Sequence, residues 1–167
     1  MIGAIVKYNP NIHHRRSIRI KEYDYSQAGA YFVTICIQDR INLLGKIVND
    51  VMALNDAGKM VNEQWLELSL RYPSIKLDNY VIMPNHFHGI IIIDQPISLS
   101  KIIGAFKSIR THCYIHGIKN SHWAAFRNTL WQRNYYEHII RSETQLRKIR
   151  DYVENNPKTW ESDGLFT

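Results

Sequence analysis

The feature that most constrains the fold is an unbroken run of four isoleucines, Ile90 to Ile93, directly after His86-Phe-His-Gly89. The run has the length of a β-strand, with Pro84 before the strand and Pro96 after it. Because successive side chains of a strand point to opposite faces, isoleucine at every position predicts that both faces are covered. We therefore expect a central strand over residues 86–94, in a sheet with protein packed on both sides.

Aromatic, β-branched and periodic apolar residues predict the other elements of the sheet and its covering helices. Further strands are expected over 31–37, 43–48, 75–83 and 130–139. Helices are expected over 55–70, 99–112 and 142–157; the last begins at a capping-box pair, Ser142 and Gln145, and ends at Pro157. The order predicts an α+β fold of the ferredoxin-like group, with an antiparallel sheet of four to five strands.

The composition indicates a single globular domain over residues 1–167, with 45% hydrophobic and 22% charged residues. Cys36 and Cys113 lie far apart and predict no disulfide framework, which suits a reducing cytoplasm. No apolar run approaches the roughly 20 residues of a membrane span, so we expect no membrane association. The formal net charge of +6 is compatible with a polyanionic partner but does not require one.

Residues 1–30 form a polar, basic N-terminal arm that contains Arg15, Arg16 and Arg19. Such an arm either stays in solvent or contacts phosphates, and its residue types favour neither reading. Lys107 and Arg110, three residues apart on the helix expected over 99–112, are further candidates for phosphate contact.

The pair His86 and His88 is the sharpest chemical feature of the chain. Residues i and i+2 of a strand point to the same face, so two imidazoles would project side by side and can hold one divalent ion. Paired histidines also occur as structural residues. A cupin-like metal site would need a glutamate a few residues further on, but Gly89 and four isoleucines follow instead.

The last helix carries Tyr152 and Asn156, four residues apart and therefore on one face. A tyrosine hydroxyl is a poor nucleophile at its ordinary pKa near 10, but a divalent cation that polarises the attacked phosphate can help it. The amide oxygen of Asn156 would be a suitable hard ligand. Equally, Tyr152 fits a half-buried helix aromatic and Asn156 a C-terminal cap.

A third segment, Leu130 to Arg141, places Arg133, Tyr135 and Glu137 on one face if it forms a strand. Basic and aromatic side chains together can contact bases or phosphates, although an edge strand with ordinary aromatic packing fits as well. Tyr135 and Tyr136 are rival candidates for a nucleophile.

Three motifs in this order resemble the REP-associated tyrosine transposases, a single-tyrosine branch of the HUH nucleases. They are Tyr80-Val-Ile-Met-Pro-Asn-His-Phe-His88, Leu130-Trp-Gln-Arg-Asn-Tyr-Tyr-Glu-His-Ile-Ile-Arg141 and Ile149-Arg-Asp-Tyr-Val-Glu-Asn-Asn-Pro157. The resemblance covers residues 15–160 and also includes Phe32 to Ile37 and Gly104 to Ser108.

The resemblance implies that His86 and His88 are metal ligands, that Tyr152 is the nucleophile and that Asn156 completes the metal site. It also implies Mg²⁺ or Mn²⁺ as cofactor and single-stranded DNA beside a REP-like hairpin as substrate. The intermediate would be a covalent 5′-phosphotyrosine. A cytoplasmic, nucleoid-associated monomer or homodimer is the corresponding expectation, with the nucleophile acting in cis or in trans.

Two alternatives stay open at this point. One is a non-catalytic nucleic-acid-binding domain that keeps the fold. The other is a metal-dependent phosphodiesterase that uses activated water and forms no covalent intermediate.

Overall fold

The expected sheet is present in the computed structural model, which describes residues 27–166. Its four strands lie in the order β4-β5-β1-β6, and every neighbouring pair is antiparallel. They are β1 (Gly29–Cys36), β4 (Ile75–Ile82), β5 (His86–Ile93) and β6 (Tyr136–Ile140). The isoleucine-rich strand β5 is central, as its composition predicts, and the α+β fold is confirmed.

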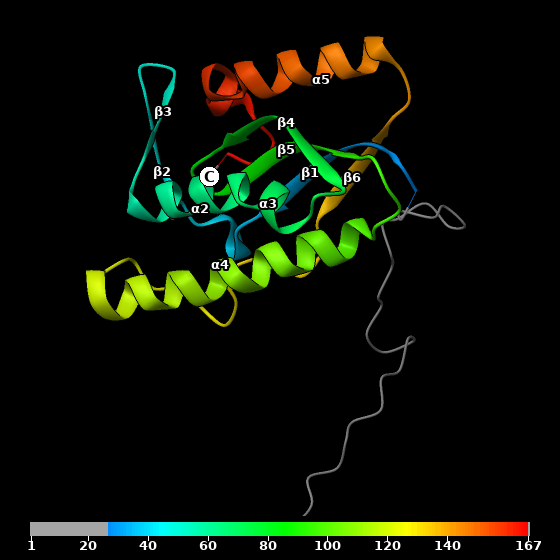
Figure 1. Cartoon of the computed structure of the whole chain (residues 1–167). Helices are drawn as coiled ribbons and strands as arrows, with labels where there is room; N and C mark the ends of the chain where they lie inside the picture. Colours follow the sequence, from blue (N-terminus) through cyan, green and yellow to red (C-terminus); the bar gives the residue numbers. More distant parts are fainter. Residues whose placement is uncertain (1–26, 167) are drawn as a thin grey trace, which may run out of the picture.

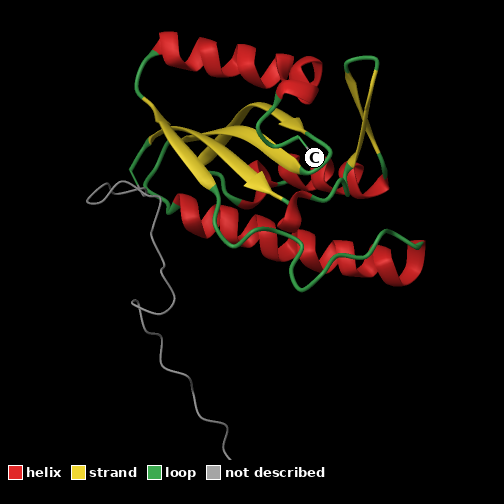
Figure 2. Ribbon diagram, turned by 180° about the vertical axis from the view of Figure 1, so that it is seen from behind, coloured by secondary structure: helices red, strands yellow, loops and turns green. Residues whose placement is uncertain are grey.

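Helices cover both faces of this sheet, which forms the middle layer of the molecule (Figures 1 and 2). On one face lie α2 (Asp56–Leu66), α3 (Leu68–Arg71) and the long α4 (Leu99–Ser121). On the other face lie α5 (Glu143–Asn155) and the 3-10 helix η2 (Asn156–Ser162). Among the described residues, no helix combines the length and apolar character needed to cross a membrane.

The main hydrophobic core lies between the sheet and the α2/α4 layer. Trp65 of α2 is fully buried against Phe87 of β5 and Phe106 of α4, with ring centroids 4.4 and 5.6 Å away. Gly89 leaves room for this cluster, since a Cβ at that position would lie 2.7 Å from both Trp65 and Phe87. Phe87 and Gly89 therefore face α2 and α4, and the alternation of β5 sends His86 and His88 to the α5 face.

Several boundaries differ from the sequence-based expectation. The helix predicted over 55–70 breaks at Glu67 into α2 and α3, and Asn55 caps its start by accepting the Gly58 N–H at 2.9 Å. Residues 43–48 contribute β2 (Gly45–Val48), which pairs with β3 (Val51–Leu54) in a separate hairpin rather than joining the main sheet. Turn residues Asn49 and Asp50, both at positive φ, connect the two strands.

Two predicted ends were misplaced for reasons of tertiary packing. Helix α4 continues past residue 112 to Ser121, because Tyr114 is buried and Gly117 lies directly under the ring of Trp123. The strand predicted over 130–139 starts only at Tyr136. Before it, Trp131 forms a single bridge to Ile37, and the Lys107 ammonium donates to the carbonyls of residues 132–134.

Candidate active site

Strand β5 presents His86 and His88 side by side on the face that α5 covers. Their ring centroids lie 4.5 Å apart, and the residues are 0% and 3% exposed. Burying two imidazoles costs free energy unless each ring nitrogen has a hydrogen-bond or metal partner. The partners of the four ring nitrogens therefore indicate the role of the pair.

The partner of His86 Nδ1 is the Asn85 side chain, whose Oδ1 lies 2.8 Å away. The Asn85 amide nitrogen donates to the carbonyls of Arg40 and Leu165, at 3.0 and 2.8 Å, which identifies Oδ1 as the acceptor atom. His86 Nδ1 must therefore carry the proton, and Nε2 carries the lone pair. That Nε2 is buried and has no hydrogen-bond partner among the described residues.

His88 is held in the same manner by β1. Its Nδ1 lies 2.8 Å from the hydroxyl of Thr34, and the two residues are directly paired across the strands. The Thr34 hydroxyl can accept from Nδ1–H, and in that tautomer Nε2 is the acceptor; the hydroxyl of Tyr152 lies 3.2 Å from this Nε2. Both histidines then turn a lone pair toward α5, the orientation that a hydrogen bond on the other ring nitrogen gives to metal-binding imidazoles.

Helix α5 brings Tyr152 to this point. Ser142 caps the start of the helix by accepting the Gln145 N–H at 3.2 Å, and the Gln145 side chain accepts the Arg141 N–H at 2.8 Å. Val153 is buried against the sheet, and neighbouring Tyr152 is 45% exposed. The Tyr152 ring packs edge-on against Phe32 and His88, so these contacts hold the ring beside the histidine pair.

Asn156 and Asp163 complete the polar cluster. The Asn156 amide nitrogen donates to Asp163 Oδ2 at 3.1 Å, and its buried Oδ1 has no hydrogen-bond partner in the described structure. Ligand atoms of His86, His88 and Asp163 all lie within 4.8 Å of one another. Two imidazole nitrogens, a carboxylate and an unsatisfied amide oxygen are a donor set that suits a divalent cation, so the residues present fit a metal.

Burial determines the protonation states of the site. Burial lowers the pKa of His86 to about 4, although the nearby Asp163 carboxylate acts in the opposite direction. Burial and the neighbouring His86 hold the pKa of His88 well below its ordinary value. Both imidazoles are therefore neutral near pH 7 and available as ligands. Burial and Asp163 raise the pKa of Tyr152, so its hydroxyl is protonated in the absence of a cation.

The rival tyrosines lie on opposite faces of the sheet. Tyr135 is buried in the main core. Tyr136 is exposed and pairs across β6 and β1 with Thr34, which in turn pairs with His88. Directly paired residues share a face, so Tyr136 is on the site's side of the sheet.

The candidate DNA contacts of the sequence analysis fall into three groups. Arg15, Arg16 and Arg19 lie outside the described residues. Arg110 is buried over the Phe106 ring and donates to Gln64, and Lys107 is held by backbone carbonyls. Because these two side chains already bind groups within the protein, they are not available as phosphate contacts in this structure. Arg133 is exposed and remains a candidate.

Sequence reasoning missed Asp163, Thr34 and Asn85. Asp163 follows a 3-10 turn beyond Pro157, and no fixed spacing relates it to the histidines. Thr34 gave no signal because its partner lies 54 residues away. Asn85 lies inside the Tyr80–His88 motif, but the sequence does not indicate that its amide sets the tautomer of His86.

A four-stranded antiparallel sheet with a buried histidine pair on an inner strand, covered by a tyrosine-bearing helix, is the arrangement of the HUH fold that the sequence resemblance implies. The comparison with known families agrees. Residues 30–156 match the family described as "Transposase IS200 like", and the chain belongs to this family.

Two proteins of Haemophilus influenzae are related in sequence. One, which has no assigned function, is 41% identical over 181 residues that cover 96% of this chain and 97% of its own length. The other, provisionally named a REP-associated tyrosine transposase, is 26% identical over 142 residues, covering 80% of this chain and 73% of its own.

Two solved structures share the fold. A REP-associated tyrosine transposase bound to a REP hairpin superposes with a TM-score of 0.64 at 20% identity, covering 85% of this chain and 74% of that one. A protein from Deinococcus radiodurans, described provisionally as a transposase, gives a TM-score of 0.51 at 17% identity, covering 83% and 97%.

Proposed function

We propose that this transposase cleaves and rejoins single-stranded DNA through a transient 5′-phosphotyrosine bond on Tyr152. The observation that carries the proposal is the position of the Tyr152 hydroxyl, 3.2 Å from Nε2 of His88 in the same chain. A half-buried helix aromatic with a structural role alone would not need its hydroxyl at a buried histidine pair. Family membership supports a reaction on DNA.

We further propose that His86, His88 and Asp163 hold Mg²⁺ or Mn²⁺, with the Oδ1 of Asn156 as an additional ligand. The support is that His86 Nε2 and Asn156 Oδ1 are buried without a hydrogen-bond partner among the described residues, and that the ligand atoms of His86, His88 and Asp163 lie together. Bound there, the cation would polarise the scissile phosphate and offset the negative charge that develops on it.

The reaction exchanges one phosphate ester for another. The Tyr152 oxygen bonds to phosphorus, the bond between phosphorus and the 3′-oxygen breaks, and the phenolic proton is balanced by the proton that the leaving 3′-hydroxyl gains. Because the phosphotyrosine ester retains the energy of the original bond, a second 3′-hydroxyl can reverse the step without ATP. One site can therefore both cut and join.

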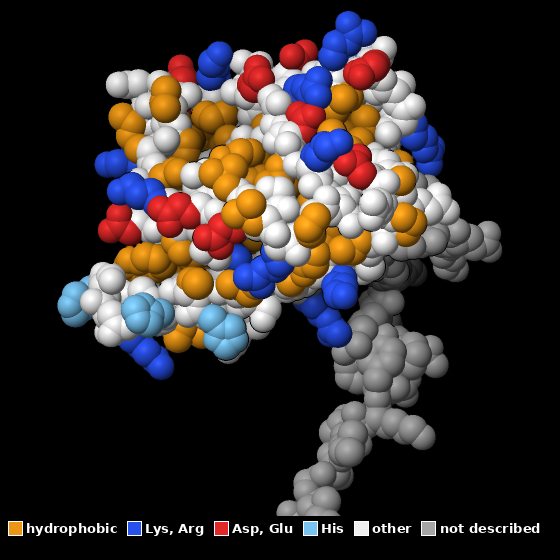
Figure 3. All heavy atoms as spheres, in the orientation of Figure 1, with side chains coloured by type: hydrophobic (Ala, Val, Ile, Leu, Met, Phe, Trp, Pro, Cys, Tyr) orange, Lys and Arg blue, Asp and Glu red, His pale blue; other side chains and the backbone are white. Residues whose placement is uncertain are grey.

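We propose a hairpin-forming strand as the substrate, by analogy with the structural relative that was solved with a REP hairpin. The charge of the protein supports a nucleic-acid partner only weakly. The net charge is +6, and acidic and basic side chains are intermixed over α5 on the face that Figure 3 shows. Basic residues 15, 16 and 19 of the N-terminal arm and Arg133 are the candidates for phosphate contact.

The test uses end-labelled hairpin oligonucleotides with Mn²⁺ or Mg²⁺ and wild type, Tyr152→Phe or His86→Ala, analysed on a denaturing gel for cleavage and on a native gel for binding. The proposal predicts a slow-migrating protein–DNA adduct with wild type only. Cut DNA without an adduct, formed equally by Tyr152→Phe, would identify a water-activated phosphodiesterase instead. Binding in a native gel with no cleavage, unaffected by His86→Ala, would identify a non-catalytic DNA-binding domain.

A further inference from the structure

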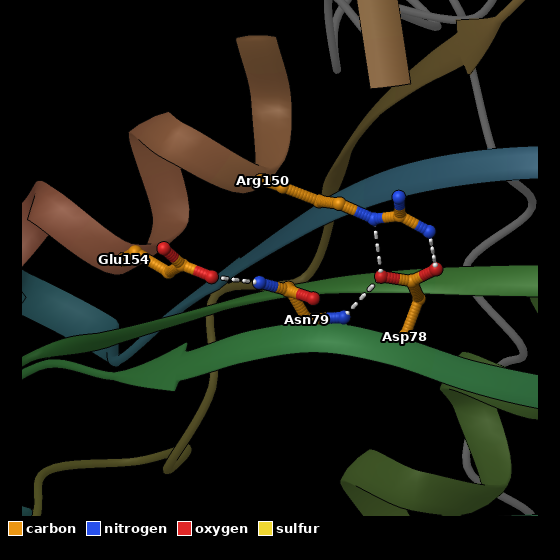
Figure 4. A network of polar contacts seen from close by, with 4 residues as sticks. All are labelled: Asp78, Asn79, Arg150 and Glu154. Carbon is orange, nitrogen blue, oxygen red and sulfur yellow. Dashed lines mark hydrogen bonds and ion pairs between the residues drawn. The ribbon is translucent and has the colours of Figure 1, made fainter. Parts of the chain in front are cut away.

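Two consecutive residues of β4, Asp78 and Asn79, both reach across to α5, the helix that carries Tyr152 (Figure 4). Asp78 accepts two hydrogen bonds from Arg150, from Nε at 2.9 Å and from Nη2 at 2.6 Å. Asn79 donates to Glu154 at 2.6 Å. Consecutive residues of a regular strand point to opposite faces, so this arrangement needs a structural cause.

The cause is a β-bulge. Leu77 pairs with Ile91 and Tyr80 pairs with Gly89, so two residues of β4 oppose the single residue Ile90. Leu77 and Tyr80 consequently both face the core, where Tyr80 packs on Trp65 and donates to Asn62 at 2.8 Å. The two residues between them are turned toward α5. Without the bulge, the alternation of β4 would point either Asp78 or Asn79 into the core.

Arg150 and Glu154, the two partners on α5, lie on either side of Tyr152 in sequence. Arg150 and Glu154 are four residues apart and lie on one side of the helix, whereas Tyr152 is two residues from each and lies on the other side. Val153 is buried against the sheet and lies on the helix surface between Tyr152 and the Arg150/Glu154 side. Contacts on one flank therefore fix the rotation of α5 about its own axis, and with it the position of the Tyr152 hydroxyl.

We propose that Asp78 and Arg150, supported by Asn79 and Glu154, are positioning residues that hold the nucleophile of the proposed reaction at the histidine pair. A rotation of about 10° moves an atom some 6 Å from the helix axis by about 1 Å. Misplacement on that scale is enough to slow a reaction by up to about 100-fold. The strength of the pair is consistent with this role, because Arg150 holds the pKa of Asp78 below its ordinary value.

The inference rests on the proposed function, so its test includes a readout that does not need cleavage. The variants are Asp78→Asn, Asn79→Ala and the reversed pair Asp78→Arg with Arg150→Asp. The matched control is Lys76→Gln, which removes a 2.7 Å ion pair with Asp94. Lys76 lies on the same strand as Asp78, and its side chain forms no hydrogen bond or ion pair with α5 among the described residues. For each protein we would measure the single-turnover rate of adduct formation at saturating DNA, the Kd for the oligonucleotide and the Tm.

The second readout is ¹⁹F NMR of protein with 3-fluorotyrosine at position 152, in the same variants without DNA. We expect Asp78→Asn to lower the adduct rate about tenfold or more, at unchanged Kd and well below its Tm, and to shift or broaden the fluorine resonance. Asn79→Ala should have the same effects in smaller measure, and the reversed pair should recover the rate and the resonance in part. Lys76→Gln should behave as wild type.

The positioning role would be overturned if Asp78→Asn and Asn79→Ala had the wild-type adduct rate and the wild-type fluorine resonance. It would also be overturned if the adduct rate fell only in proportion to the loss of Tm. If wild type forms no adduct, the proposed function fails, but the fluorine spectra still decide whether these contacts position residue 152. If Asp78→Asn does not fold, the rate and spectrum of Asn79→Ala decide the question.

Discussion

The hydroxyl of Tyr152 lies 3.2 Å from Nε2 of His88, although 64 residues separate the two in sequence. The contact joins the inner strand β5 to helix α5 and brings the proposed nucleophile to the histidine pair within one chain.

The first prediction concerns the proposed metal ligands. His86→Ala should weaken binding of Mn²⁺ at least tenfold, because it removes a proposed ligand whose lone pair has no hydrogen-bond partner among the described residues. Titration calorimetry with Mn²⁺ and with Mg²⁺ would measure the effect. Asp163→Asn should also weaken binding, since it removes the only negative charge among the grouped ligands. If Asp163→Asn binds as tightly as wild type while His86→Ala does not, the carboxylate is not a ligand.

A second prediction tests the hydroxyl that orients His88. Thr34→Val keeps the side-chain volume but removes the hydroxyl that hydrogen-bonds with His88 Nδ1 at 2.8 Å. We expect a loss of about 10- to 100-fold in metal affinity, the usual cost of losing such a partner. Thr34→Ser retains the hydroxyl and should stay within about threefold of wild type. Equal affinities for the valine and serine variants would show that the hydrogen bond does not orient the ring.

Sequence patterns predicted this site only in part, for physical reasons. The alternation along β5 placed His86 and His88 on one face, and the four-residue spacing on α5 aligned Tyr152 with Asn156. Both patterns depend only on the local periodicity of a strand or a helix, and both pairs of residues share a face in the structure. The meeting of β5 and α5, the Thr34 partner across β1 and the approach of Asp163 depend on how distant segments pack, which residue spacing does not encode. The family resemblance supplied the first of these, but not the other two.

The same limit applies to the fold. The isoleucine run identified the central strand because burial on both faces leaves a local signature. The end of α4 and the start of β6 are set by Tyr114 and by Lys107, which find their partners elsewhere in the chain. The bulge in β4 was also not predicted, because its evidence is the pairing with β5.

Two glycines provide a third prediction, about stability. A Cβ at Gly89 would lie 2.7 Å from two packed aromatic rings, whereas a Cβ at Gly104 has no atom within 4 Å. Gly89→Ala should lower the free energy of unfolding by about 1–3 kcal/mol through overpacking. Gly104→Ala, within helix α4, should raise it by about 0.5–1 kcal/mol. Urea unfolding of both variants measures the difference, and a destabilised Gly104→Ala would contradict the packing described for α4.

The fourth prediction is a pH dependence of stability. The Arg150 guanidinium lowers the pKa of Asp78 below its ordinary value of 3.8. The unfolded chain therefore binds this proton more readily, so the contribution of Asp78 is fully present above about pH 4 and is lost as pH falls through the lower folded value. Asp78→Asn should remove that part of the acid-side decline, measured by urea unfolding between about pH 5 and 2. An unchanged decline would mean that the pair does not stabilise the folded state.

The most direct test of the central claim is the location of the covalent bond. Adduct formed from a hairpin oligonucleotide and Mn²⁺ would be digested with nuclease and trypsin, and the nucleotide-modified peptide sequenced by mass spectrometry. The account predicts a 5′-phosphate linked to Tyr152 and no modification of Tyr136, the exposed tyrosine on the same side of the sheet. A phosphate on Tyr136, or adduct at wild-type level from Tyr152→Phe, would contradict it.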